Sequence, residues 1–148
     1  MEISERRKAF IEAARQYKDC PFRHQGRNPE SGLDCVGVIV LAAQEVLGWT
    51  EGPRDYPNRP TSEIAFSRAA QFAMRISPGD ARPGDVVQMR SGDHTTHFGI
   101  LTDTGLIHAT STGGKVVEHI FKRDPVESLK RFGVKAWWRL NGMDDECS

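Results

Sequence analysis

The first half of the chain places its hydrophobic residues at the spacing of α-helices. Apolar residues recur three or four positions apart over 10–17, which predicts a first helix that is capped by Ser4 and ends near Lys18. Apolar residues over 62–76 supply a wide hydrophobic side, and we expect a further helix across that whole range. Both helices alternate apolar with charged positions, so each is expected to pack one face on a core.

A central helix is predicted over 36–47, the most hydrophobic stretch of the chain, and a cysteine stands at its start. Asp34 is a suitable N-cap and Gly48 a suitable terminator. Residues 20–34 combine Pro, Gly, Asn and Ser, so we expect a loop without regular structure ahead of the helix. Cys35 would lie at the positive end of the helix macrodipole, where the pKa of a cysteine falls from about 8.5 to roughly 3.5–7.5. We therefore expect Cys35 to be a thiolate nucleophile.

Beyond residue 80 the pattern changes to short β-rich segments separated by turn residues. Helices followed by a run of strands predict an α+β fold with an antiparallel sheet. A three-proline stretch over 49–61 is expected to form an ordered loop and is a candidate cleft wall. We expect a single domain over 1–141 and a polar, disordered tail over 142–148. The predicted strands are 86–89, 98–102, 106–110, 116–120 and 134–140.

Charge and composition argue against several classes of function. The 20 basic and 20 acidic residues cancel without a long run of one sign, so nucleic-acid binding is not expected. No secretory signal is recognised at the N-terminus, and the twelve residues of 36–47 fall short of the roughly 20 that span a bilayer. Three scattered cysteines do not form a disulfide framework. We expect synthesis in the cytoplasm, without a signal peptide or a membrane anchor.

Four blocks of sequence resemble the NlpC type cell-wall cysteine peptidase family. They are Pro-Phe-Arg-His-Gln-Gly at 21–26, Gly-Leu-Asp-Cys-Val-Gly-Val-Ile at 32–39, Arg-Pro-Gly-Asp-Val-Val at 82–87, and His-Phe-Gly-Ile-Leu at 97–101 with Leu-Ile-His-Ala at 106–109. The resemblance implies a papain-like α+β fold. It also implies hydrolysis, without a cofactor, of amide bonds in peptidoglycan stem peptides next to D-glutamate.

The first block and the Asp-Cys-Val-Gly variant most resemble the bacteriophage and gene-transfer-agent tail branch of that family. This implies phage-like tail proteins as partners and incorporation into a phage-like particle. Two residues depart from the family's pattern. Phe22 stands where a tyrosine is frequent, and Val36 stands where serine usually follows the cysteine.

The resemblance assigns three catalytic roles. Cys35 matches the nucleophile, His97 the general base, and His108 the residue that orients His97. A two-residue turn at 104–105 would leave the two histidines four residues out of register, roughly 13 Å apart. Direct contact between them would then require another register or a bulge. Asp34 is a candidate contact for a substrate amine in addition to its capping role, and Arg23, His24 and Gln25, in the loop leading to Cys35, are candidate contacts for substrate carboxylates or else part of a solvated polar loop.

Alternative interpretations remain open. Cys35, His94, His97 and His108 together form a possible zinc ligand set, but no acidic general base accompanies them, so no metal is expected. His119 is expected to be a surface residue of its strand. Other classes of function that fit the sequence are an amidase or acyltransferase acting on a cytoplasmic small molecule, and a tail structural or assembly protein without turnover.

Overall fold

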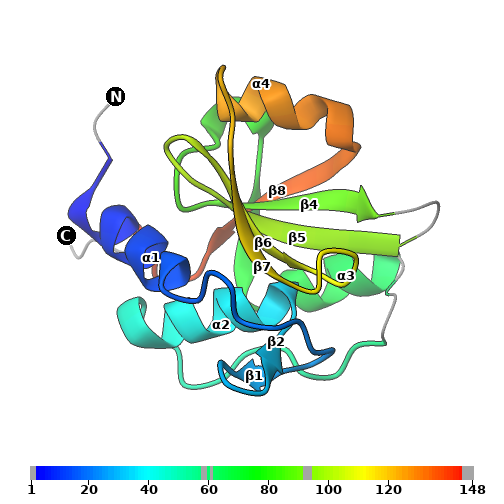
Figure 1. The fold of residues 1–148 in the computed structure, drawn as a ribbon. Helices are drawn as coiled ribbons and strands as arrows, with labels where there is room; N and C mark the ends of the chain where they lie inside the picture. The colour runs from blue at the N-terminus through cyan, green and yellow to red at the C-terminus, as the bar shows by residue number, and fades with distance from the viewer. Residues whose placement is uncertain (1–2, 58–59, 61, 92–94, 145–148) are drawn as a thin grey trace.

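A six-stranded antiparallel sheet forms the centre of the molecule (Figure 1). The computed structural model of the chain describes residues 3–57, 60, 62–91 and 95–144. The strand order in the sheet is β3-β8-β4-β5-β6-β7, and each strand pairs antiparallel with its neighbours, as an α+β fold requires. The strands are β3 (Ala73–Ile76), β4 (Val86–Ser91), β5 (Thr95–Leu101), β6 (Gly105–Thr110), β7 (Lys115–Ile120) and β8 (Val134–Leu140).

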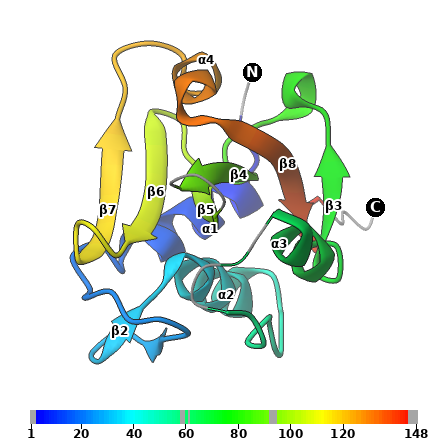
Figure 2. The ribbon, with the colours of Figure 1, turned by 90° about the vertical axis from the view of Figure 1, so that its right-hand side faces the viewer.

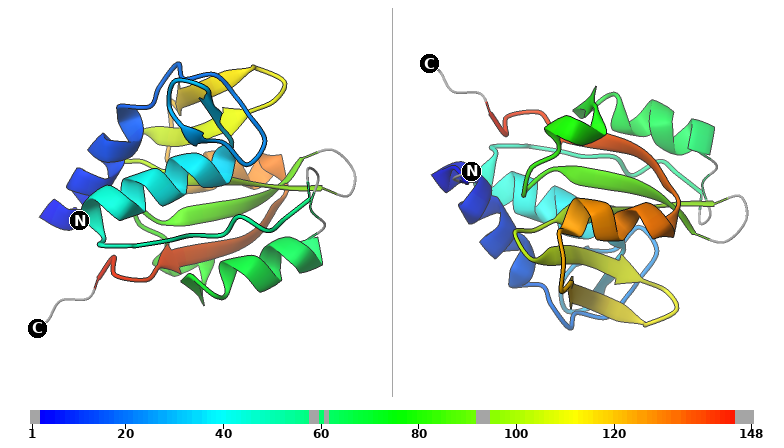
Figure 3. Two further views of the ribbon diagram at one scale, coloured as in Figure 1. Left: turned by 90° about the horizontal axis from the view of Figure 1, so that it is seen from below. Right: turned by 90° about the horizontal axis from the view of Figure 1, so that it is seen from above.

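Helices cover both faces of this sheet (Figures 2 and 3). The helices α1 (Glu5–Arg15) and α2 (Cys35–Val46) lie side by side on one face, and α4 (Pro125–Leu129) packs on the other. The helix α3 (Ser62–Ala69) lies beside the β3–β8 edge. Two short 3₁₀ turns, Pro78–Asp80 and Lys130–Phe132, lead into the strands that follow them.

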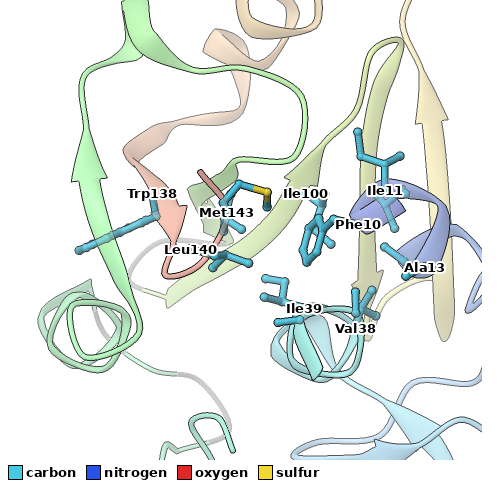
Figure 4. Packing of buried hydrophobic residues seen from close by; sticks show 14 of the residues in the cluster. Phe10, Ile11, Ala13, Val38, Ile39, Ile100, Trp138, Leu140 and Met143 are labelled. Carbon is cyan, nitrogen blue, oxygen red and sulfur yellow. The ribbon is translucent and has the colours of Figure 1, made fainter. Parts of the chain in front are cut away.

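The main core lies between the paired helices α1 and α2 and the sheet (Figure 4). Phe10 of α1 and Val38 of α2 are buried against Ile100 of β5, and burial of such side chains is the main contribution to the stability of the fold. Gly37, in the first turn of α2, is required by close packing, since a Cβ there would lie 2.3 Å from the carbonyl oxygen of Gly26. This contact presses the loop before Cys35 against the first turn of α2.

A buried ion-pair network joins the N-terminal helix to the sheet. The Arg7 guanidinium, 2% exposed, lies 3.2 Å from the carboxylate of Asp85, which is fully buried. Arg139 of β8 donates to the same carboxylate at 2.8 Å, and Arg7 also pairs with Asp144 at 2.9 Å. Because each buried charge has a partner, the network ties α1, the turn before β4 and the end of β8 together.

Two expectations about secondary structure are wrong. The helix expected over 62–76 ends at Ala69, and Ala73–Ile76 forms the edge strand β3, paired with β8. A short apolar run satisfies either period, and here the free edge of β8 supplies a hydrogen-bond ladder that a longer helix could not use. The loop over 20–34 contains a small two-stranded hairpin formed by β1 (Arg27–Asn28) and β2 (Gly32–Leu33).

The polar tail expected over 142–148 is ordered at its start. Met143 is 1% exposed within the main core, and Asp144 belongs to the ion-pair network. Residues 145–148 lie outside the described residues. Within the described part of the chain, no helix combines the length and apolar character needed to cross a membrane.

Candidate active site

Cys35 is the first residue of α2 and faces a cleft of about 950 Å³. The helix begins there because Asp34 caps it, its carboxylate accepting from the Gly37 N–H at 2.8 Å. The thiol lies against the backbone N–H groups of Cys35, Val36 and Phe98, which act to lower its pKa. Phe98 directly follows His97 in β5, so the sulfur lies against the strand that carries the expected base.

The expected thiolate is contradicted by the surroundings of the sulfur. Burial raises the pKa of the Cys35 thiol to about 12, and the negative charge of the neighbouring Asp34 acts in the same direction. The capping carboxylate therefore opposes the helix dipole that was expected to favour an anion. The residue as a whole keeps intermediate exposure and lines the cleft, and burial of its thiol favours the neutral form over the thiolate.

Asp34 is 4% exposed, and four hydrogen bonds occupy its carboxylate. One oxygen accepts from the Gly37 N–H and from Arg27 Nη1 at 3.2 Å. The other accepts from the Gln25 N–H at 2.8 Å and from the Tyr56 hydroxyl at 2.5 Å. The N-cap role is confirmed. A substrate amine would reach this carboxylate only by replacing one of these donors.

Tyr56 was not identified from the sequence as a site residue. Its loop, between α2 and α3, is held by a hydrogen bond from Gln25 Nε2 to the Tyr56 carbonyl at 2.8 Å and by one from Arg27 to the Pro53 carbonyl. Both Pro53 and Tyr56 line the cleft, so the expected cleft wall is confirmed. The three prolines signal an ordered loop, but no local pattern indicates which side chain enters the site.

His97 and His108 are in direct contact, with His97 Nε2 lying 2.6 Å from His108 Nδ1. The expected separation of four residues is wrong, because β5 and β6 pair Ile100 with Ile107 and Leu101 with Leu106, which places the reversal at 103–104. In this register the histidines are offset by only two residues, a diagonal that side chains can bridge. The regular pairing ends at Ile100, and the two rings meet just beyond it.

Both rings are neutral at neutral pH. Burial lowers the pKa of His97 to about 4, although the charge of Asp34 acts in the opposite direction. Burial also lowers the pKa of His108 to about 3, assisted by the nearby rings of His97 and His119. Because His108 occupies Nε2 of His97, the nitrogen of His97 that is open to a reacting group is Nδ1.

The structure places the expected substrate residues in different surroundings. Asp34 and His24 line the cleft together with Cys35, and the His24 ring meets the Tyr56 ring edge-on at 5.7 Å between centroids. Arg23 and Gln25 are exposed in the preceding loop and do not line the cleft.

The structure describes three of the four residues proposed as zinc ligands, Cys35, His97 and His108. Among the described residues, no group of three or more His, Cys, Asp or Glu side chains is arranged to hold a metal ion. His94, one of the four residues of that alternative set, lies outside the described residues.

The α+β fold, with a cysteine at a central helix N-terminus and a histidine pair on the adjacent sheet, is papain-like. The family model of the NlpC/P60 family matches residues 19–136, and the chain belongs to this family. Membership agrees with the solved structures that share the fold, among them the NlpC/p60 domain of the peptidoglycan hydrolase SagA. That domain is 25% identical, with a TM-score of 0.57 over 88% of this chain and 96% of the other.

Of two further relatives, one is named as a hydrolase and the other is described as non-catalytic. A gamma-DL-glutamyl hydrolase of Bacillus subtilis (strain 168) is 26% identical over 136 residues, which cover 88% of this chain and 29% of that protein. The chain thus spans less than a third of that relative. RipD from Mycobacterium tuberculosis, described as a non-catalytic NlpC/p60 domain protein adapted to peptidoglycan binding, is 15% identical, with a TM-score of 0.58 over 94% of this chain and 99% of the other.

Proposed function

We propose that this protein is a thiol hydrolase that cleaves amide bonds in peptidoglycan stem peptides, next to D-glutamate. The observation that carries the proposal is the placement of Cys35, at the start of α2, in one cleft with the hydrogen-bonded pair His97 and His108. The substrate class is supported by the relatives, one of which is a gamma-DL-glutamyl hydrolase and another a peptidoglycan hydrolase. No cofactor is required for this chemistry.

The reaction begins from a neutral thiol and a neutral imidazole. His97, with its proton on Nε2 donated to His108 Nδ1, takes the thiol proton at Nδ1 as Cys35 attacks the amide carbonyl. Burial lowers the pKa of His97 to about 4, so nearly all of the ring is unprotonated and ready to accept a proton at pH 7. The proton then passes to the leaving amine, and water resolves the acyl-enzyme.

The oxyanion of the tetrahedral intermediate requires donors near the sulfur. The backbone N–H of Cys35 lies at the N-terminus of α2, where N–H groups have no partner within the helix. The Phe98 N–H also faces the thiol and adds a second donor from the sheet. Phe22 has no hydroxyl to donate, so the backbone N–H groups stabilise the oxyanion.

Digestion of purified peptidoglycan tests the proposal. Wild type, Cys35→Ala and the matched control Cys20→Ala are compared, with released peptides identified by mass spectrometry and new amine termini located. We expect cleavage by wild type and Cys20→Ala and none by Cys35→Ala. Failure of wild type to cleave peptidoglycan or synthetic γ-D-glutamyl peptides would refute the proposed activity. Binding to peptidoglycan without cleavage would instead match what is described for RipD.

A role in a phage-like tail is a separate part of the proposal. It rests on the loop at 21–26 and on the Asp-Cys-Val-Gly variant at 34–37. Such a particle would deliver the hydrolase to peptidoglycan. Sedimentation of particles from the source organism, followed by immunodetection, is expected to find the protein in the particle fraction. Its absence from that fraction, or a genome neighbourhood without tail genes, would contradict tail association and leave the hydrolase proposal standing.

A further inference from the structure

Three histidine rings from three neighbouring strands lie in a row. His97 of β5 contacts His108 of β6 at 2.6 Å, and the His108 ring lies 5.0 Å from that of His119 of β7, between centroids, at an interplanar angle of 53°. The β6–β7 register pairs His108 with Val117 and Leu106 with His119, which makes His108 and His119 diagonal neighbours on one face. His119 is exposed and lines the cleft, so its ring can turn about its side-chain torsions without moving β7.

The middle ring of this row has one nitrogen without a partner. His108 Nε2 is buried and makes no hydrogen bond, whereas its Nδ1 contacts His97. When His97 acts as a base through Nδ1, its own proton is on Nε2 and is donated to His108 Nδ1. The proton of His108 is then on Nε2, a buried donor with nothing to accept it. The arrangement needed for catalysis thus puts a proton on His108 Nε2, and the lack of an acceptor for that buried N–H disfavours it.

We propose that His119 is a positioning residue that accepts a hydrogen bond from His108 Nε2–H and so holds His97 in the tautomer with an open Nδ1. The inference rests on the proposed role of His97 as the base. Among the described side chains, His119 is the polar group whose ring already lies against His108 on the side away from His97. The proposal requires this exposed ring to rotate until one of its nitrogens lies within hydrogen-bond distance of His108 Nε2.

The proposal makes the site sensitive to the charge of His119. A protonated His119 can only donate, so His108 must accept at Nε2 and carry its proton on Nδ1. His97 then accepts at Nε2 and carries its proton on Nδ1, which blocks it as a base. The system gains one proton, located on His119, and both other rings stay neutral.

The groups around His119 leave this charge without compensation. No salt bridge joins His119 to an acid among the described residues. Glu118, the adjacent acid in β7, is bound by Arg15 at 2.8 Å, and Lys115 at the other end of the strand pairs with Asp19. On the β6 side the ring faces His108. A proton on His119 therefore acts mainly on the histidine row.

Nitrogen-15 NMR of the histidine rings tests the inference without reference to any substrate. Wild type is compared with His119→Gln, whose amide oxygen accepts a hydrogen bond and does not titrate, and with His119→Leu, which cannot accept. At pH 8 we expect His108 to carry its proton on Nε2 in wild type and in His119→Gln. Below the pH at which the spectra show His119 to have gained a proton, wild type is expected to switch to Nδ1, whereas His119→Gln is not. An Nε2 tautomer retained in His119→Leu, or no switch in wild type, would overturn the inference.

Hydrolysis of a γ-D-glutamyl peptide gives the second readout. Loss of the acceptor in His119→Leu is expected to lower kcat about tenfold with KM unchanged, which corresponds to about 1.4 kcal/mol. His119→Gln is expected to keep the wild-type rate at pH 8 and to lose the acid limb of the pH profile. Lys122→Gln, an exposed change three positions further along the chain, is the control and should match wild type. If wild type hydrolyses nothing, the proposed function fails, and the NMR result still decides the role of His119.

Discussion

Lowering the pH from 7.5 to 5 is expected to destabilise the fold through the histidine pair. Burial lowers the pKa of His97 to about 4 and that of His108 to about 3, whereas in an unfolded chain a histidine titrates near 6.5. Between these values the unfolded state binds more protons than the folded state. The stability contributed by the pair is therefore complete above about pH 6.5 and falls as the pH drops towards the folded pKa values.

The magnitude follows from the pH interval. A pH of 5 is about 1.5 units below the pKa of histidine in the unfolded chain and is still above the pKa values of both rings in the folded protein. Each pH unit in this interval changes the free energy of unfolding by about 1.36 kcal/mol per ring. Each ring alone would thus lower the free energy of unfolding by about 2 kcal/mol. Because the two rings share one hydrogen bond and His97 contributes to the low pKa of His108, we expect about 2–4 kcal/mol for the pair.

Urea unfolding at the two pH values measures this loss in wild type, His108→Asn and Lys122→Gln. Carboxylates also begin to titrate at pH 5, but their contribution is common to all three proteins and cancels in the comparison. His108→Asn is expected to lose about 2 kcal/mol less than wild type on acidification, and Lys122→Gln, at an exposed position, the same as wild type. An identical loss in His108→Asn and wild type would mean that the pair is not held neutral in the folded state.

Two further predictions concern the stability of the framework around the site. Arg7→Met removes a guanidinium that is 2% exposed and leaves the buried Asp85 carboxylate with Arg139 as its partner, so we expect a loss of about 1.5–3 kcal/mol in urea unfolding, the range for a hydrogen bond to a charged group. Lys8→Met breaks an exposed pair on the same helix and should cost less than about 0.5 kcal/mol; equal losses would contradict the assigned role of the buried network. Tyr56→Phe removes a hydrogen bond to the buried carboxylate of Asp34 and is expected to cost about 1.5–3 kcal/mol, with faster proteolysis of the loop between α2 and α3. Unchanged stability and unchanged proteolysis would show that this hydroxyl does not hold the loop.

Features that depend on neighbouring residues were predicted correctly. The cap at Asp34, the start of α2 at Cys35 and the left-handed Gly48 after its end follow from side chains and backbone within one turn. The strands β4 to β8 were located because Gly, Asp and Ser interrupt short β-rich runs. The α+β fold follows from the order of these elements, and Cys35, His97 and His108, which match the family, lie on them.

The errors occur where a second segment decides the outcome. Residues 73–76 satisfy a helical period, yet they pair with β8, because a free strand edge offers hydrogen bonds that no local pattern reveals. The contact between His97 and His108 depends on where β5 turns into β6, and a shift of the turn by one residue changes their offset by two. Tyr56 enters the site from a loop that its own sequence marks only as ordered.

The sequence by itself determined most of the helices and strands and the family resemblance, and it predicted Cys35, His97 and His108 as the catalytic residues. Only the tertiary structure decided the electrostatics of the site. A helix N-terminus favours a thiolate, but burial and the charge of Asp34 raise the pKa of Cys35 to about 12. Solvation and the charges of distant segments set a pKa, and both depend on how the chain packs in three dimensions.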